Sequence, residues 1–272
     1  MESIYKDVMP VKPVAPWLGG KVKLAKKVVS LINQIDHKTY CEPFVGMGGI
    51  FFRRTRAPQA EFINDYSRDV SNLFRILNKH YTPFIEMLRY QITGREEFGR
   101  LLKQDPDTLT DLERAARFIY LQKTSFGGKV TGQNFGISPG RPGRFNITTL
   151  EPMLQDVHER LSGVVIECMD WSDFIKRYDR PGALFYLDPP YFNNEDDYGQ
   201  DMFRRDSFDY MARLLKCISG AFILSINDRP QIRELFKEFS MIEVDLHYSL
   251  AGKNSKDTRA NELIITNRPH IL

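Results

Sequence analysis

The stretch ALFYLDPPY, at residues 183–191, decides the fold of this chain. Its first five residues are apolar without interruption, as is typical of a strand of a parallel sheet that is buried on both faces. Asp188 and two prolines then end the strand, and ligands of open α/β sheets bind at the carboxyl ends of strands. The sequence therefore predicts an α/β protein with a ligand site at Asp188.

The residue types at this site suit a planar base that carries an amino group. Asp188 offers a carboxylate that only accepts hydrogen bonds, and Tyr191 offers an aromatic face. Pro189 and Pro190 stiffen the backbone between them. The alternative is an ordinary turn after a strand, because Asp and Pro are common in turns. Four specified residues in a row occur by chance about once in 10⁵ positions, which favours a site.

The rest of the chain alternates between strand-like and helix-like segments around a middle of different composition. Strands are expected at 39–44, 61–64, 164–168, 183–187, 221–226, 241–247 and 262–266, and helices start at 50, 69 and 112. Seven strands fit one sheet. We therefore expect an α/β domain in two parts, residues 1–90 and 161–272, separated by an insertion at residues 91–160.

The insertion contains a long, glycine-rich segment at residues 123–146. A loop of this length is usually functional or disordered. Cations alternate in it with Phe126, Phe135 and Phe145, so that phosphate contact and base stacking are both served. The candidate nucleic-acid contacts are Lys129, Asn134, Arg141 and Arg144. A charged surface hairpin without a ligand is the alternative.

Composition excludes some classes of protein. The 272 residues are 42% hydrophobic, which is enough for a full core, and no run approaches the length of a membrane span. The N-terminus lacks the apolar stretch of a signal peptide, so we expect a soluble, cytoplasmic protein. The net charge of +3 is too mild to prove nucleic-acid binding, although basic residues cluster at 21–27, 53–56, 123–144 and 253–259. Cys41, Cys168 and Cys217 lack metal-ligand spacing and are expected in the core, and no metal site is expected.

Two further segments have the composition of a ligand site. EPFVGMGG, at residues 42–49, allows close backbone approach to a ligand, although it lacks the third glycine of the dinucleotide fingerprint. Asp65 follows the next strand, where a carboxylate accepts hydrogen bonds from ribose hydroxyls or caps a helix. WLGGK, at residues 17–21, combines a planar ring, a flexible backbone and a cation. This set suits an adenine and a carboxylate, and a buried Trp beside a turn is the alternative.

In their order along the chain, these motifs resemble those of the Dam-type DNA adenine-N6 methyltransferases of the D12 class. The matching segments are residues 17–21, 42–48, 64–65 and 188–191, and the resemblance covers nearly the whole chain. It implies a Rossmann-like, seven-stranded sheet that binds S-adenosylmethionine and has a seventh, antiparallel strand. It also implies an inserted, mainly helical DNA-recognition domain that carries a loop or hairpin.

The resemblance also implies roles for single residues. The catalytic residues would be Asp188, Pro189, Pro190 and Tyr191. The methyl donor would contact Trp17, Gly19, Gly20, Lys21, Glu42, Phe44, Gly46, Gly48, Asp65, Asp170 and Asp188. Asp170 is the loosest match, because it equally suits a helix N-cap. The tyrosine-asparagine-glycine run and the base-reading arginine of the family are missing near residue 126, so GATC specificity does not carry over.

The sequence thus predicts a site-specific adenine-N6 methyltransferase that flips its target out of duplex DNA. Tyr191 would stack on the base, while Asp188 and the Pro189 carbonyl accept hydrogen bonds from its amine for a direct in-line transfer. We expect a monomer with duplex DNA as its partner, and a cognate nuclease where a restriction-modification pair exists. Methylation of N4-cytosine in DNA or of RNA, and a catalytically silent DNA-binding homologue, remain alternatives.

Overall fold

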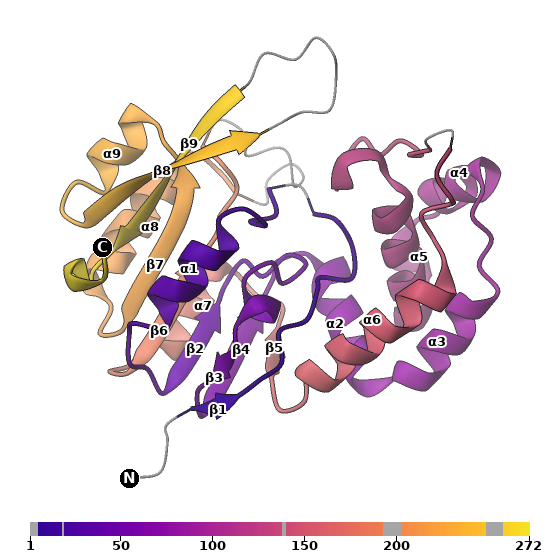
Figure 1. The fold of residues 1–272 in the computed structure, drawn as a ribbon, viewed down its shortest axis with the longest axis horizontal. Coiled ribbons are helices and arrows are strands. Elements are labelled where there is room, and N and C mark those ends of the chain that lie inside the picture. Colours follow the sequence, from indigo (N-terminus) through magenta and orange to yellow (C-terminus); the bar gives the residue numbers. More distant parts are fainter. Residues whose placement is uncertain (1–4, 18, 138–139, 193–202, 249–257) are drawn as a thin grey trace.

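The computed structural model describes residues 5–17, 19–137, 140–192, 203–248 and 258–272 (Figure 1). A single seven-stranded sheet has the order β5-β4-β2-β6-β7-β9-β8. Its strands are β2 (Thr39–Glu42), β4 (Ala60–Asn64), β5 (Val165–Glu167), β6 (Ala183–Leu187), β7 (Ala221–Asn227), β8 (Ser240–Tyr248) and β9 (Thr258–Thr266). The strands from β5 to β7 are parallel, and β9 is antiparallel to both of its neighbours. The prediction of seven strands in one sheet is confirmed.

The quoted apolar run forms the central strand. All five residues of β6 are buried, and Phe185 lies opposite Cys41 of β2 and Phe222 of β7. Side chains of a strand alternate between the two faces of a sheet. Leu184 and Tyr186 therefore belong to the core on one face, and Phe185 belongs to the core on the other.

Helices cover both faces of the sheet. The face that contains Phe185 packs against α7 (Trp171–Tyr178), α8 (Asp206–Cys217) and α9 (Pro230–Leu235). The face that contains Tyr186 packs against α1 (Ala25–Ile32) and α2 (Arg68–Lys79). The described chain is thus a three-layer α/β structure, supplemented by a small sheet of β1 (Lys6–Asp7) and β3 (Arg56–Ala57) and by a last turn, η5 (Pro269–Ile271).

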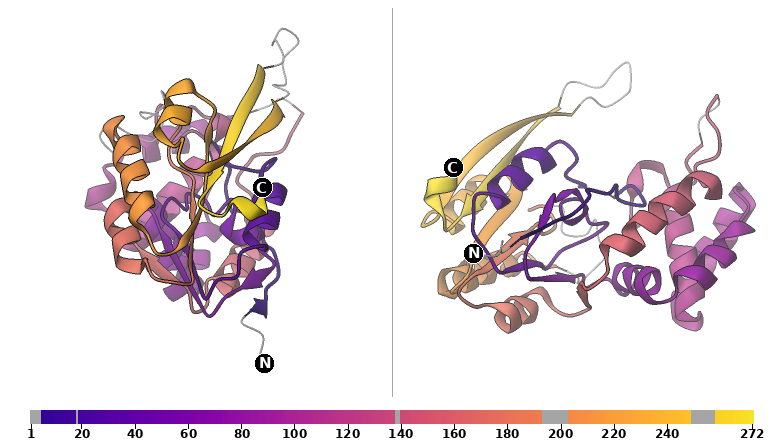
Figure 2. Two further views of the ribbon diagram at one scale, coloured as in Figure 1. Left: turned by 90° about the vertical axis from the view of Figure 1, so that its left-hand side faces the viewer. Right: turned by 60° about the horizontal axis from the view of Figure 1, so that its bottom comes forward.

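Further helices gather beside the β5 edge of the sheet, as the views in Figures 1 and 2 show. They are α3 (Tyr81–Arg89), α4 (Arg95–Lys103), α5 (Asp111–Thr124) and α6 (Ile147–Arg160), with the short turns η2 (Pro106–Thr108) and η3 (Phe126–Gly128). Thr110 and Glu113 form a reciprocal capping box that starts α5. The division of the chain at residues 90 and 160 stays a prediction.

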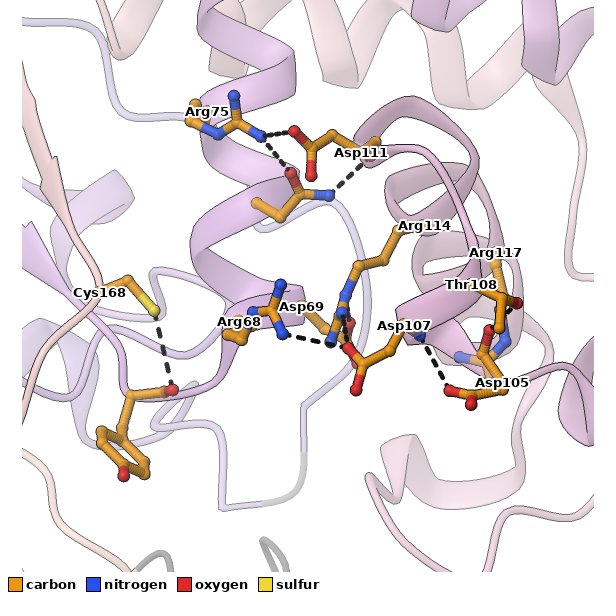
Figure 3. Close-up of polar contacts among 12 residues, drawn as sticks. Arg68, Asp69, Arg75, Asp105, Asp107, Thr108, Asp111, Arg114, Arg117 and Cys168 are labelled. Carbon is orange, nitrogen blue, oxygen red and sulfur yellow. Dashed lines mark hydrogen bonds and ion pairs between the residues drawn. The ribbon is translucent and has the colours of Figure 1, made fainter.

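Polar contacts connect this helical part to α2, as Figure 3 shows. Arg114 of α5 donates to Asp69 of α2 at 2.5 Å and to Asp107 of η2 at 2.7 Å. Arg75 of α2 pairs with Asp111 at the start of α5. Since α2 also packs on the sheet, these pairs fix the orientation of α5 relative to the sheet.

Three expectations from the sequence are corrected by the structure. The helix expected from residue 69 is broken at His80, because Pro83 lacks an N–H and its ring excludes the carbonyl four residues earlier. The helix expected from residue 50 is one 3₁₀ turn, η1 (Phe51–Arg53). Cys41 is buried, but Cys168 and Cys217 are exposed, since they lie where the edge strand β5 and helix α8 end.

One of the basic clusters is partly occupied within the protein. Arg54 of the cluster at 53–56 is buried and pairs with Glu61, so it is not available to a phosphate. The cluster at 253–259 lies outside the described side chains. Among the described helices, none combines the length and the apolar character that crossing a membrane requires.

Candidate active site

The candidate active site is a pocket of about 440 Å³ at the carboxyl ends of β2, β4 and β6. Most of the residues predicted for donor binding and catalysis line it together, namely Trp17, Gly19, Gly20, Lys21, Glu42, Phe44, Gly46, Asp65, Asp188 and Pro190. Four predicted residues, Gly48, Asp170, Pro189 and Tyr191, do not line it. The topology thus brings residues of all four matching segments to one place.

Lys21 is the centre of a buried charge cluster. Its Nζ lies 3.1 Å from Asp188 Oδ1 and 3.3 Å from Glu262 Oε2 of β9. It also donates to Tyr191 Oη at 2.6 Å, and this hydroxyl in turn donates to Glu262 Oε1. One cation therefore faces two carboxylates, and the tyrosine that follows the proline pair is fixed between them.

Asp188 is a carboxylate in a poorly solvated position. Its side chain is 22% exposed, and Ser225 Oγ donates to its Oδ1 at 3.3 Å. Burial raises the pKa of Asp188 to about 6. The positive charge of Lys21 lowers this pKa, and the negative charge of Glu262 raises it. Lys21 and Ser225 both contact Oδ1, so Oδ2 can accept a hydrogen bond from a ligand.

The glycine turn after β2 makes room for neighbouring side chains. Gly46 has φ +49°, and a Cβ on it would lie 2.7 Å from Nε1 of Trp17. Gly48 has φ +72°, and its Cβ would lie 2.2 Å from the ring of Phe52. Only glycine tolerates both demands, the positive φ and the close contact. At Gly46 the contact places the indole of Trp17 against the turn, and at Gly48 it serves core packing.

Asp65 connects this turn to β4. Its Oδ2 accepts from Gly46 N at 2.8 Å and its Oδ1 accepts from Ser67 N at 2.9 Å. Burial raises the pKa of Asp65 to about 6, although both backbone N–H groups lower it. A carboxylate has about four lone-pair positions, so two remain for the hydroxyls of a ligand in the pocket.

Glu42 also lines the pocket, is buried, and is the first member of a series of polar contacts that leads away from the pocket. Tyr40 Oη donates to its Oε2 at 2.9 Å, and the guanidinium of Arg54 lies 3.6 Å from the centroid of the Tyr40 ring. Burial raises the pKa of Glu42 to about 8. Beyond Arg54, Glu61 accepts two hydrogen bonds from Arg160 at the end of α6.

Comparison with known proteins decides the family. Residues 17–250 match the family described as D12 class N6 adenine-specific DNA methyltransferases. This chain belongs to that family. A type II methyltransferase of Lactococcus lactis subsp. cremoris is 28% identical over 98% of this chain and 99% of its own length. A type II methyltransferase of Paramecium bursaria Chlorella virus NC1A is 23% identical over 94% of this chain and 100% of its own length.

A third relative extends beyond the match. The DNA N-6-adenine-methyltransferase of Escherichia phage P1 is 25% identical over 84% of this chain, which corresponds to 32% of that protein. The predicted resemblance to D12 methyltransferases is thereby confirmed. Membership in a methyltransferase family also implies S-adenosylmethionine as the methyl donor.

In this D12 methyltransferase, Asp170 caps a helix. Its Oδ1 accepts from Ser172 N at 2.8 Å and from Ser172 Oγ at 2.6 Å at the start of α7. The next residue, Trp171, lines the pocket instead and stacks on Phe44 at a centroid distance of 6.1 Å. Phe203 completes this aromatic wall. Trp171 directly follows Asp170 in the sequence, so an aromatic side chain beside a predicted donor contact was the available signal for this pocket residue.

None of the four predicted DNA contacts lines the pocket, although Val130, next to Lys129, does. An isolated antiparallel bridge between Ser125 and Phe135 closes a surface hairpin at residues 125–135, which contains Lys129 and Asn134. Arg141 and Arg144 follow the hairpin in the chain, and all four side chains are exposed. Arg144 donates to Ser125 O at 2.8 Å and lies over the ring of Phe126. Phe126 is 65% exposed, whereas Phe145 is buried and Phe135 half-buried. Of the three interleaved rings, only Phe126 is therefore available for stacking.

Sequence reasoning missed four charged residues of the site. Lys12, Arg53 and Lys123 line the pocket, and Glu262 pairs with Lys21. Arg53 and Lys123 belong to the basic clusters of the sequence, but no signal distinguished them from their neighbours. In the described ranges, no three His, Cys, Asp or Glu side chains are arranged as a metal site.

Proposed function

We propose that this D12 methyltransferase transfers a methyl group from S-adenosylmethionine to N6 of an adenine that is flipped out of duplex DNA. The observation that supports this most directly is Asp188, a half-buried carboxylate at the end of β6, in the wall of a pocket that Asp65 and Lys21 also line.

The chemistry of the pocket fits the proposed donor. Asp65 retains acceptor positions for ribose hydroxyls, and the rings of Trp17, Phe44 and Trp171 offer apolar faces for an adenine. The pocket also contains positive charge that suits the carboxylate of the donor or DNA phosphates, from Lys12, Arg53 and Lys123. When bound, the donor supplies an electrophilic methyl group on a sulfonium.

The protein's own groups would orient the target amine. Asp188 Oδ2 and the carbonyl of Pro189 accept its two N–H bonds, so that the nitrogen lone pair points along the axis of transfer. Positive charge would develop on this nitrogen as the new C–N bond forms and the S–C bond to the methyl group breaks, and it would be lost when the methylated amine releases a proton to solvent. Asp188 stabilises that charge, and the carboxylate is effective because little water surrounds it. No covalent bond to the protein is required.

Tyr191 was predicted to stack on the target base, but its ring does not line the pocket. Its hydroxyl lies between Lys21 and Glu262, and its ring lies beside the pocket and not in its wall. We infer that the tyrosine borders the space into which the base is flipped. Extrusion of a base costs a few kcal/mol, which contacts from the exposed Lys129, Asn134, Arg141 and Arg144 would offset.

The test is methyl transfer from labelled S-adenosylmethionine to a sequence-diverse pool of duplex DNA, with the product base identified and mapped. We expect N6-methyladenine in one short context and a loss of at least about 10³-fold with Asp188→Asn. Asp173→Asn, an exposed aspartate with only a surface ion pair, serves as the matched control and should keep full activity. Donor binding without any methylated DNA base refutes the proposal.

The other outcomes of this assay identify the alternatives. N4-methylcytosine in the product would assign the same amine chemistry to another base, and transfer to RNA alone would change the substrate class. Binding of duplex DNA without transfer to any acceptor would indicate a silent homologue. Because two relatives are type II methyltransferases, we also propose that a cognate restriction nuclease exists. We propose in addition that the enzyme is a monomer.

A further inference from the structure

Gln122 lies between the donor pocket and the hairpin. It is fully buried near the end of α5, and its Nε2 donates to Pro16 O at 2.8 Å and to Gly128 O at 2.7 Å. Pro16 immediately precedes Trp17 of the pocket wall, and Gly128 ends the turn η3 that opens the hairpin. Both N–H bonds of one side chain therefore join two segments that are distant in the sequence.

The two segments also touch directly. A Cβ on Gly128 would lie 3.0 Å from Pro16 C and 3.0 Å from Trp17 N. On the other side, the ring of Trp17 packs edge-on against Phe118 of α5 at a centroid distance of 6.4 Å. Little space remains between the segments, so a movement of one displaces the other.

The carbonyl end of Gln122 reaches further into the hairpin. Gln133 Nε2 donates to Gln122 Oε1 at 3.4 Å and to Lys129 O at 2.9 Å. Lys129 is one of the exposed cations proposed to contact DNA. A polar chain thus runs from the DNA-facing loop through a buried amide to the backbone of the donor pocket.

We propose that Gln122 is a positioning residue that couples the hairpin to the donor pocket, so that DNA and donor each strengthen the binding of the other. This inference rests on the proposed function. DNA that orders the hairpin fixes Gly128 and Gln133, and through Gln122 it fixes Pro16 and the adjoining Trp17. Coupling of this kind is reciprocal, because binding free energies form a closed cycle.

The test measures the affinity for S-adenosylhomocysteine, which cannot transfer a methyl group, with and without a duplex that contains the mapped methylation site. We expect the duplex to tighten binding at least about fivefold in the parent chain, the lower end of usual coupling. With Gln122→Met, which keeps the side-chain length but removes both N–H donors, the ratio should fall below about twofold. Gln155→Met, at a half-buried position of α6 where, among the described residues, the amide pairs only with Glu159, is the matched control and should keep the parent ratio.

Each result separates this inference from the proposed function. A parent chain that neither binds nor methylates DNA contradicts the proposed function. A parent chain that methylates DNA, but whose coupling ratio is one or survives Gln122→Met, overturns the inference alone. If Gln122→Met does not fold, Gln133→Met is the second variant, because it removes the hydrogen bond from the half-buried Gln133 to Gln122. It should lower the coupling ratio while leaving the melting temperature unchanged.

Discussion

Glu262→Gln should move the acid limb of the pH–rate profile to lower pH. Asp188 must be ionised to accept the amine hydrogens, and burial raises its pKa to about 6. If the parent chain has the proposed activity, we expect it to be lost as the pH falls through about 6. The negative charge of Glu262 contributes to the raised pKa of Asp188, so its removal favours the ionised form.

The size of the shift follows from the positions of the charges. Lys21 Nζ lies 3.1 Å from Asp188 Oδ1 and 3.3 Å from Glu262 Oε2, which places the two carboxylates within about 6 Å of each other. With an effective dielectric constant of about 20, two unit charges at this distance repel by about 2.7 kcal/mol. Since Asp188 is partly exposed to solvent, we expect about half of this, or a displacement of about one pH unit.

Single-turnover rates between about pH 4.5 and about pH 8 measure this displacement. Lys21 and Ser225 contact Asp188, and the charges of Glu262 and Glu42 and the hydroxyl of Tyr186 also act on it. Glutamine at position 262 keeps an acceptor for Tyr191 and removes the charge. The plateau rate should also fall, because Lys21 then pairs with Asp188 alone. An acid limb that stays in place or moves to higher pH refutes the reasoning.

Three further substitutions test the structural assignments. Gly46→Ala should weaken donor binding at least about tenfold and cost about 2 kcal/mol of stability, because it places a Cβ against the indole at a positive φ. Gly99→Ala, in α4 and outside the pocket, would place a Cβ with nothing within 4 Å and should leave donor binding unchanged. Asp170→Ala should cost about 1 kcal/mol in denaturant unfolding with donor affinity unchanged, and Asp170→Ser should restore the loss, since the side chain caps α7. Glu61→Gln should cost about 3–5 kcal/mol by the same measurement, because it leaves two buried arginines without a counter-charge.

The parallel strands were predictable from the sequence for a simple reason. A strand buried on both faces must be apolar throughout, and β6 begins and ends at the residues of its apolar run. Because ligand-binding residues follow the carboxyl ends of such strands, the predicted boundaries of β4 and β6 assign Asp65 and Asp188 to one edge of the sheet. Glu42 lay inside the strand predicted at 39–44 and reaches this edge because β2 ends at Glu42. Strand period and topology thus account for the donor side of the pocket.

What the sequence left open depends on contacts between distant segments. Glu262 comes from β9, an antiparallel strand to which no site residue was assigned, and only the sheet order brings it to Lys21. Gly48 was assigned to the donor, yet the space above it is filled by Phe52, four residues along. Asp170 was assigned by its position after a strand, where a cap and a ligand contact require the same residue type.

The charge balance of the site follows from the same geometry and explains its energetic logic. Lys21 between Asp188 and Glu262 leaves one net negative charge in a poorly solvated cluster. If Lys21 faced Asp188 alone, the pair would be neutral and the developing cation on the amine would gain little from it. With Glu262 present, the cluster is stabilised by an arriving positive charge, and this is the charge that the proposed transition state creates. The burial that raises the pKa of Asp188 in the free protein is therefore the same feature that favours the reaction.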